Sequence, residues 1–270
     1  MTEYIISSTK LSNNFNDFIV LDCRAELGNP GWGYKEYLKE HISGSHFVDG
    51  ENKLSDPVTI HGGRHPLPDL ETLRKYMESL GISDNSKVVA YGLYAGRTVF
   101  ILRLFGIEAS LISGDFNFLK EKGLSVDSGI PAPEKGNITG KAITNLIRNM
   151  EYVKNRLNNP AVTIIDSRAP ERFQGIVEPI DKIAGHIPGA VNFLWEQIKK
   201  ADSEILPESE LKLLYSFIDP SKEIIIYCGS GVTACYNWIA LRHIGIDSSI
   251  YAGSWSDWIS YEETPKVVKK

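Results

Sequence analysis

The second half of the chain repeats motifs of the first half, in the same order and at a nearly constant spacing. The matching pairs are Ile19–Arg24 with Thr163–Arg168, Glu40–Ser45 with Gly185–Ala190, and Leu102–Ile107 with Leu241–Ile246. The spacing is about 140 positions, far longer than the period of about 20–50 residues that builds solenoids and propellers. The chain is therefore predicted to hold two copies of one domain fold.

A stretch rich in proline, glycine and charge separates the two copies. Residues 127–136 contain two prolines and two glycines and show no periodicity of apolar residues, which is typical of a linker. We therefore predict an N-terminal domain over residues 1–126, a linker over 127–140 and a C-terminal domain over 141–270. Each predicted domain is close to the common domain size of about 100–150 residues.

Short apolar runs alternate with longer amphipathic ones in each half. In the second half, strands are expected at Val162–Asp166, Ala190–Phe193, Glu223–Tyr227 and Ser248–Tyr251, and helices at Thr144–Leu157, Glu208–Ser216 and Thr233–His243. Counterparts in the first half include a strand at Lys87–Tyr91 and a helix at Arg97–Phe105. The run Ile224–Tyr227 lacks polar alternation, which is typical of a strand covered on both faces. The predicted fold class is α/β, with a parallel sheet flanked by helices in each of two tandem domains.

Composition and charge argue against several classes of protein. No apolar run approaches the roughly 20 residues that span a bilayer, and the net charge of -5 comes with no block of Lys and Arg except Lys266–Lys270. We therefore expect neither a membrane protein nor a nucleic-acid partner. The first ten residues show no secretory signal, so the predicted location is the cytoplasm. Thiols stay reduced there, and three cysteines in a chain of this length do not make a disulfide scaffold.

One cysteine stands between a predicted buried strand and a predicted helix. Cys228 follows the strand Glu223–Tyr227, the loop after it contains Gly229 and Gly231, and a helix is expected from Thr233. Ligand sites of open α/β sheets lie at the carboxyl ends of strands. Glycines let backbone N–H groups turn toward a common centre, and the helix N-terminus adds partial positive charge there. These features favour a thiolate and predict a nucleophile. The alternative is a buried structural cysteine before an ordinary turn.

Two rival chemistries are disfavoured by the residues around the cysteine. A cysteine-dependent phosphatase needs an arginine six residues after the cysteine, but position 234 is alanine and the loop holds no Arg or Lys. A metal site needs a further cluster of ligands with recognisable spacing, and the sequence offers none, so no metal is expected. Cys235 lies two helical turns further on, about 10 Å from the loop, and is interpreted as a packing residue.

Several motifs taken together resemble the two-domain rhodanese family of sulfurtransferases. They are Asp22–Arg24, His41–Gly44, Asp166–Arg168, Gly185–Ala190, Cys228–Thr233 and Tyr251–Trp258. The resemblance implies two tandem rhodanese-like domains, of which only the second is catalytic. In that family the cysteine takes a sulfur atom from a small-molecule donor as a persulfide, and an acceptor such as cyanide, a small thiol or a thioredoxin-like protein removes it. No cofactor is implied. The sequence agrees independently, because the counterpart stretch Tyr91–Arg97 contains no cysteine.

The resemblance leaves two donors open. The loop Cys228–Thr233 resembles that of 3-mercaptopyruvate sulfurtransferases, whereas thiosulfate-selective members carry basic residues just after the cysteine. The substrate-binding residues implied in this way are Arg172, Gly229, Gly231, Val232 and Thr233. Mercaptopyruvate enzymes hold the substrate carboxylate with two arginines, and Arg172 matches the first. The second has no clean match, since the nearest candidates are Asp181 and Lys182, so thiosulfate stays an alternative donor.

The same resemblance implies a relay of Asp, His and Ser beside the cysteine. Its counterparts are Asp49, His65 and Ser230, which adds a contribution of the first predicted domain to the active site. The alternative is that Asp49 and His65 are loop residues with structural hydrogen bonds. The motif residues that recur in both halves are expected to be structural, namely Asp166, Arg168, His41 and His186. A non-catalytic binding module is the remaining alternative for the function.

Overall fold

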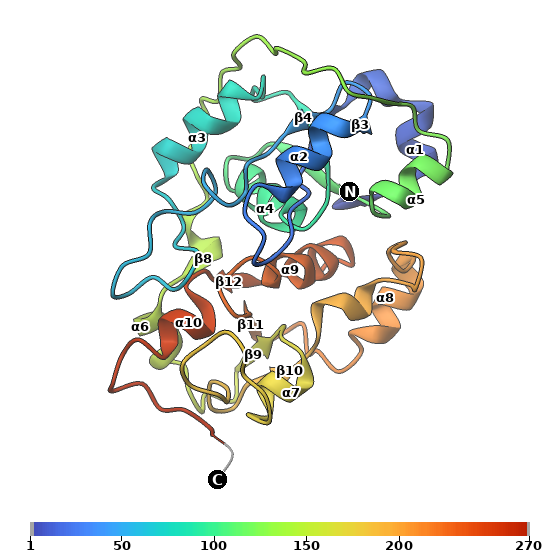
Figure 1. Cartoon of the computed structure of the whole chain (residues 1–270). Coiled ribbons are helices and arrows are strands. Elements are labelled where there is room, and N and C mark those ends of the chain that lie inside the picture. Colours follow the sequence, from blue (N-terminus) through green and yellow to red (C-terminus); the bar gives the residue numbers. More distant parts are fainter. Residues whose placement is uncertain (1–2, 269–270) are drawn as a thin grey trace. The chain divides into compact units, whose positions relative to one another are not determined.

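The computed structural model describes residues 3–268 and divides into two compact units (Figure 1). The first unit holds the chain up to Ser55, Pro68–Thr144 and Lys199–Leu206. The second unit holds Asp56–Leu67, Asn145–Ile198 and the chain from Pro207 onward. Two short stretches, Asp56–Leu67 and Lys199–Leu206, thus belong to the unit that is built mainly from the other half of the sequence.

The first unit is built on a five-stranded parallel sheet. Its strand order is β1 (Ile5–Ile6), β6 (Glu108–Ile112), β5 (Lys87–Tyr91), β2 (Ile19–Asp22) and β4 (His46–Phe47). The helices are α1 (Ser8–Asn13), α2 (Trp32–Lys39), α3 (Leu70–Ser79), α4 (Ala95–Leu104) and α5 (Phe116–Glu121), with a 3-10 turn η1 (Phe15–Asp17). A small antiparallel pair joins β3 (His41–Ile42) to β7 (Val126–Asp127). Buried side chains of the sheet and helices, such as Val89 and Leu119, form its core.

The second unit repeats this sheet strand for strand. Its order is β8 (Ile147–Arg148), β12 (Ser249–Tyr251), β11 (Glu223–Tyr227), β9 (Val162–Asp166) and β10 (Val191–Asn192), again all parallel. The helices are α6 (Met150–Lys154), α7 (Pro170–Phe173), α8 (Glu208–Leu214), α9 (Ala234–His243) and α10 (Ser254–Trp258), with 3-10 turns η2 (Thr144–Leu146) and η3 (Trp195–Ile198). The shared order confirms the predicted α/β fold, in which each half carries a parallel sheet with helices.

One predicted helix of the second half is wrong. The sequence pattern favours a single helix over Thr144–Leu157, but the chain forms η2, then β8, and only then α6. Two features divide the segment. Ile147 and Arg148 pair with β12, and the side chain of Asn149 accepts a hydrogen bond from the N–H of Tyr152 at 2.9 Å, which starts a new helix. The apolar residues of this segment are therefore divided between the strand β8 and the helix α6.

The central strand β11 is covered on both faces, as its sequence predicts. Residues 224–227 are all buried, and β11 lies between β9 and β12. The loop that follows β11 therefore starts from the middle of the sheet. In open α/β sheets this is the place where ligands bind.

A buried ion pair at the end of one strand recurs in both units. In the second unit Arg168 donates to Asp166 at 2.6 Å and to the carbonyl oxygen of Gly185, also at 2.6 Å. In the first unit Arg24 donates in the same way to Asp22 and to the carbonyl oxygen of Glu40. The recurring histidines also match, since each Nδ1 lies 2.7 Å from a carbonyl oxygen, that of Tyr37 for His41 and that of Phe173 for His186. These bonds agree with a structural role for all four predicted scaffold residues.

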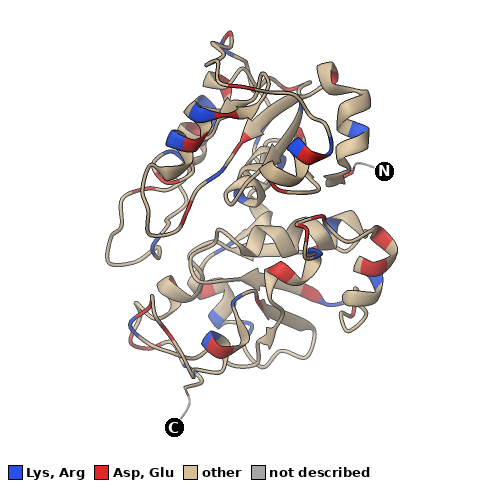
Figure 2. Cartoon of the chain, turned by 45° about the vertical axis from the view of Figure 1, so that its right-hand side comes forward, with Lys and Arg blue, Asp and Glu red and all other residues tan. Residues whose placement is uncertain are grey.

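Basic and acidic residues are interspersed over the elements of each unit (Figure 2). Several form ion pairs one helical turn apart, such as Lys212 with Glu208 on α8 at 2.6 Å. Within residues 3–268, none of the helices has the length and apolar character that crossing a membrane requires.

Candidate active site

The candidate nucleophile lies directly after the central strand of the second unit. Cys228 follows the last residue of β11, and residues 228–233 form the loop that leads into α9. Cys228 is almost completely buried, with 2% of its surface exposed. Gly231 has a φ of +79°, and a Cβ atom there would collide with the carbonyl oxygen of Ala252. Glycine is therefore required at this point of the loop.

Hydrogen-bond donors converge on the sulfur of Cys228. The backbone N–H of Gly231 donates to Sγ at 3.1 Å. Burial raises the pKa of this thiol, but hydrogen bonds from the Thr233 hydroxyl and from the N–H groups of Ser230, Ala234 and Gly231 outweigh burial. The pKa therefore lies below its ordinary value, and the loop favours the thiolate.

The other two cysteines lack this arrangement. Burial raises the pKa of Cys23 far above its ordinary value, although the hydroxyl of Thr98 lies 3.4 Å from its Sγ. One hydroxyl does not offset the burial of a thiol, whereas one hydroxyl and three N–H groups do so at Cys228. Cys235 is buried in the first turn of α9 and donates to the carbonyl oxygen of Gly231 at 3.4 Å. The predicted separation of about 10 Å from the loop is therefore wrong, because α9 begins only at Ala234, while the burial of Cys235 agrees with a packing role.

The backbone of the cysteine loop is held by the start of α10. The N–H of Cys228 donates to Ser254 Oγ at 3.1 Å, and the N–H of Trp255 donates to the carbonyl oxygen of Cys228 at 3.0 Å. The N–H of Ser256 donates to the carbonyl oxygen of Gly229, also at 3.0 Å. Trp255 is fully buried, as a packing residue should be. Because α10 binds both carbonyl oxygens, the loop is fixed with its later N–H groups directed at the sulfur.

The stretch Asp56–Leu67 is bonded to the same helix. The N–H of Gly62 donates to Asp257 Oδ1 at 2.7 Å, and the N–H of Arg64 donates to Ser256 Oγ at 3.1 Å. The helix α10 therefore fixes both the cysteine loop and the backbone of this stretch.

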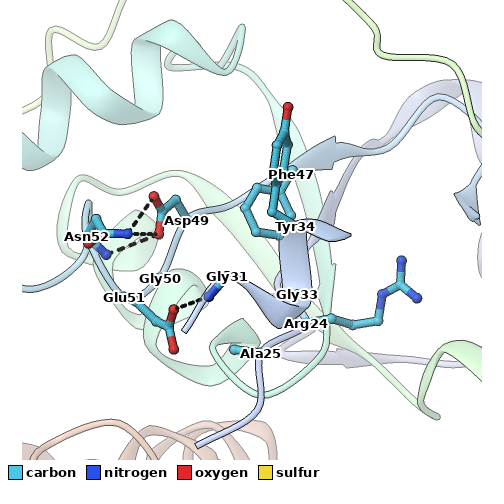
Figure 3. Close-up of a pocket in the computed structure, with 10 residues that line it drawn as sticks. All are labelled: Arg24, Ala25, Gly31, Gly33, Tyr34, Phe47, Asp49, Gly50, Glu51 and Asn52. Atoms are coloured by element: carbon cyan, nitrogen blue, oxygen red, sulfur yellow. Dashed lines mark hydrogen bonds between the residues drawn. The ribbon is translucent and has the colours of Figure 1, made fainter. Parts of the chain in front are cut away.

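Two members of the predicted relay meet in the second unit. Nδ1 of His65 lies 2.7 Å from Oγ of Ser230, within hydrogen-bond distance. Asp49 belongs to the first unit, where both of its carboxylate oxygens accept hydrogen bonds from the side-chain amide of Asn52 (Figure 3). The place of Asp49 in a relay stays a prediction.

Asp49 also lines a cavity of about 350 Å³ in the first unit (Figure 3). The lining residues are Arg24, Ala25, Gly31, Gly33, Tyr34, Phe47, Asp49, Gly50, Glu51 and Asn52. The aromatic rings of Tyr34 and Phe47 lie on one side and the carboxylates of Asp49 and Glu51 on the other (Figure 3). None of the residues that line the cavity is a cysteine.

Two guanidinium groups flank Gly229 in the cysteine loop. A Cβ atom added to Gly229 would lie 2.8 Å from Nη2 of Arg64 and 3.6 Å from both terminal nitrogens of Arg172. Arg172 donates to Glu178 at 2.8 Å and to Asp181 at 2.9 Å, while Arg64 pairs with the other oxygen of Asp181. Carboxylates therefore hold both arginines beside the loop. Glycine at position 229 leaves room for them.

Sequence reasoning missed Arg64. The family pattern places a second arginine after Arg172, where this chain has Asp181 and Lys182. In the structure Asp181 binds both arginines. The sequence signal for Arg64 is its place next to His65, a residue of the predicted relay. Of the remaining predicted loop residues, Val232 is buried.

The arrangement suits attack by a thiolate on an anionic substrate. A buried thiol with a lowered pKa is nucleophilic without an adjacent base, and the same N–H groups can hold a negative charge on a sulfur atom bonded to it. The guanidinium groups beside the loop are suited to bind a carboxylate or another planar anion.

Comparisons with known proteins identify the family. The family of the Rhodanese-like domain matches residues 149–261, which span the cysteine loop. A probable 3-mercaptopyruvate sulfurtransferase of Pseudomonas aeruginosa is 37% identical over 92% of this chain and 92% of its own length. The thiosulfate sulfurtransferase of Bos taurus is 32% identical over 83% of this chain and 79% of its own length.

A solved structure agrees with the sequence comparisons. SseA from Escherichia coli, described as a 3-mercaptopyruvate sulfotransferase with the rhodanese fold, superposes with a TM-score of 0.81 at 28% identity. The match covers 94% of this chain and all of SseA. The chain therefore belongs to the rhodanese family of sulfurtransferases.

Proposed function

We propose that this sulfurtransferase takes sulfur from 3-mercaptopyruvate and passes it to a thiol, with Cys228 as the carrier. The observation that carries the proposal is the environment of Cys228, a buried thiol whose pKa is lowered by four hydrogen-bond donors. Gly229 and Ser230 follow it and carry no charge, while Arg172 lies beside the loop. This combination suits a singly charged carboxylate donor.

The first half of the proposed reaction forms a persulfide. The thiolate of Cys228 attacks the sulfur atom of 3-mercaptopyruvate, an S–S bond forms, and the C–S bond of the donor breaks. The electron pair of that bond leaves with the carbon as the enolate of pyruvate, which takes up a proton. The N–H groups of the loop hold the charge of the sulfur that remains on Cys228.

The proton for the enolate comes from Ser230 in this proposal. Its hydroxyl is bonded to His65, so a proton that leaves Ser230 can be replaced through the imidazole ring. A role of Asp49 in this relay stays a prediction from the family resemblance. The other loop residues, Gly231, Val232 and Thr233, shape the loop or bind the sulfur.

The second half of the proposed reaction returns the enzyme to its thiolate form. A thiolate acceptor attacks the outer sulfur, the S–S bond to Cys228 breaks, and the product is the persulfide of the acceptor. We propose a small thiol or a thioredoxin-like protein as this acceptor, because both are abundant in a reducing cytoplasm.

Thiosulfate is the second candidate donor. The similarity to a thiosulfate sulfurtransferase, at 32% identity over most of the chain, favours it. Two guanidinium groups beside the loop could also bind a sulfonate-like anion. The two donors are separated by measuring kcat/KM for each with the same acceptor. A higher value for thiosulfate would contradict the preference that we propose.

The carrier is tested by measuring the mass of the intact protein after treatment with donor and no acceptor. Wild-type protein should gain one sulfur atom, and peptide mapping should place it on Cys228. The variant Cys228→Ser should neither gain sulfur nor turn over. The matched controls Cys23→Ser and Cys235→Ser should do both. Turnover that survives in Cys228→Ser would refute the assignment.

A further inference from the structure

A guanidinium group from the stretch Asp56–Leu67 lies beside the cysteine loop. Nη2 of Arg64 is 2.8 Å from the position of a Cβ atom on Gly229, closer than the terminal nitrogens of Arg172. The side chain of Arg64 is 28% exposed, so part of it is open to solvent. Arg64 thus lies beside the loop of Cys228, although the family pattern places a second arginine in the stretch after Arg172.

We propose that Arg64 is the second arginine that binds the carboxylate of the sulfur donor, together with Arg172. This inference deepens the proposed function and rests on it. Asp181 acts as a positioning residue, because one of its oxygens binds each arginine. Both guanidinium groups are thereby held near Gly229, and the planar fork of an arginine is suited to bidentate recognition of a carboxylate.

The charges around the two arginines favour a donor with one negative charge. Three guanidinium groups, those of Arg64, Arg168 and Arg172, are packed against three carboxylates, and the site carries no surplus of positive charge. The three carboxylates are Asp166, Glu178 and Asp181. A single carboxylate bound by Arg64 and Arg172 adds one negative charge to this balance, whereas a dianion such as thiosulfate adds two.

The charges that affect the pKa of Arg64 also favour the binding of an anion. Burial lowers the pKa of Arg64, and the nearby charge of Arg172 lowers it further, while the Cys228 thiolate and Glu178 act in the opposite direction. Asp181 already pairs with both of these like charges, and a carboxylate bound beside them would reduce their repulsion further.

The position of Arg64 relative to Cys228 is set by one helix. The backbone N–H of Arg64 is bonded to Ser256 Oγ, and the backbone N–H of Ser256 is bonded to the carbonyl oxygen of Gly229. The backbone of Arg64 is therefore held in place relative to the cysteine loop, and Asp181 holds its guanidinium group. Such fixed placement is what converts binding of a donor into a productive orientation.

The proposal is tested with Arg64→Ala and Arg64→Lys, in steady-state measurements with 3-mercaptopyruvate. Arg64→Ala should raise KM by about tenfold to a hundredfold with a smaller change in kcat, the loss expected for one charged hydrogen-bonding group. Arg64→Lys keeps the charge for Asp181 but loses the planar fork, so its KM should lie in between. Pyruvate, which shares the carboxylate but lacks the sulfur, should inhibit each variant more weakly in proportion to its rise in KM.

Arg242→Ala is the matched control, because Arg242 also pairs with an aspartate, Asp247, and its side chain is 27% exposed. Its KM should match that of wild type. An unchanged KM and unchanged inhibition by pyruvate in both Arg64 variants, with circular dichroism as in wild type, would overturn the proposal. If Arg64→Ala does not fold, Arg64→Lys decides alone. Wild-type protein that forms no persulfide from 3-mercaptopyruvate would instead overturn the proposed function, so the two failures are distinguishable.

Discussion

Replacing Thr233 by valine tests how the loop produces a nucleophilic thiol. The hydroxyl of Thr233 is the strongest of the donors that lower the pKa of Cys228 against the effect of burial. Valine has the same shape as threonine but cannot donate. A hydrogen bond to a charged group contributes about 1.5–3 kcal/mol, and one pKa unit corresponds to about 1.36 kcal/mol. Thr233→Val should therefore raise the pKa of Cys228 by about one to two units.

The assay is the rate of alkylation of Cys228 by iodoacetamide as a function of pH. The rate follows the fraction of thiolate, so its midpoint gives the thiol pKa. Thr98→Val is the matched control, since Thr98 is a buried threonine next to the sulfur of a different cysteine, Cys23. It should leave the midpoint for Cys228 unchanged, and peptide mapping should assign the alkylated residue.

Two results would refute the reasoning. A midpoint for Thr233→Val within about 0.3 units of wild type would mean that backbone N–H groups alone stabilise the thiolate. An equal shift in Thr98→Val would mean that the change spreads through the whole protein and does not come from the local hydrogen bond. The first result leaves a testable alternative, because Gly231 donates its N–H to the same sulfur.

Four further predictions concern the same site. Ser230→Ala should lower kcat more for 3-mercaptopyruvate than for thiosulfate, because sulfite leaves with little need of a proton; Ser230→Lys should shift the ratio of kcat/KM toward thiosulfate by adding positive charge beside Cys228. Gly231→Ala should destabilise the fold, since its φ is +79° and Ala252 leaves no space, and a melting temperature equal to wild type would contradict this. Arg172→Ala should raise KM for 3-mercaptopyruvate by about tenfold to a hundredfold. The pKa of Cys228 is lower in the folded protein than in the unfolded chain, so the free energy of unfolding should rise as pH increases from the lowered pKa toward 9.0. Urea titrations should show that this gain is lost as pH falls through the lowered pKa, and that Cys228→Ser lacks it.

The repeat in the sequence predicts the fold well because the repeated residues bind partners that are close to them in sequence. Asp22 and Asp166 bind the arginine two positions later and end equivalent strands, so a short motif carries the whole feature. The strand β11 is equally predictable from the sequence, because a strand that is buried on both faces shows no alternation of polar residues, as in Ile224–Tyr227. The error over Thr144–Leu157 has a local cause too, since the side-chain cap of Asn149 outweighs the apolar period around it.

The surroundings of Cys228 are only partly predictable, because several of the surrounding residues are far from Cys228 in the sequence. The glycines and Thr233 lie in the loop itself and could be read directly. Ser256 and Arg64 act through bonds that join positions 192 residues apart. Such a contact depends on which unit the stretch Asp56–Leu67 packs with, and no local sequence pattern predicts this packing. The extent of the predicted domains, 1–126 and 141–270, likewise stays a prediction.

Comparison of the two equivalent loops explains why only one of them can carry a nucleophile. In the second unit six residues, 228–233, separate β11 from α9, which is enough for several N–H groups to turn toward one sulfur. In the first unit only residues 92–94 separate β5 from α4. The position equivalent to Cys228 is Gly92, whose φ is +97° and where a Cβ atom would lie 2.5 Å from the backbone nitrogen of Arg24. A cysteine at position 92 would be strained and would face fewer donors. Sulfur transfer therefore depends on the length and backbone of the loop, and a single substitution in the first unit could not reproduce it.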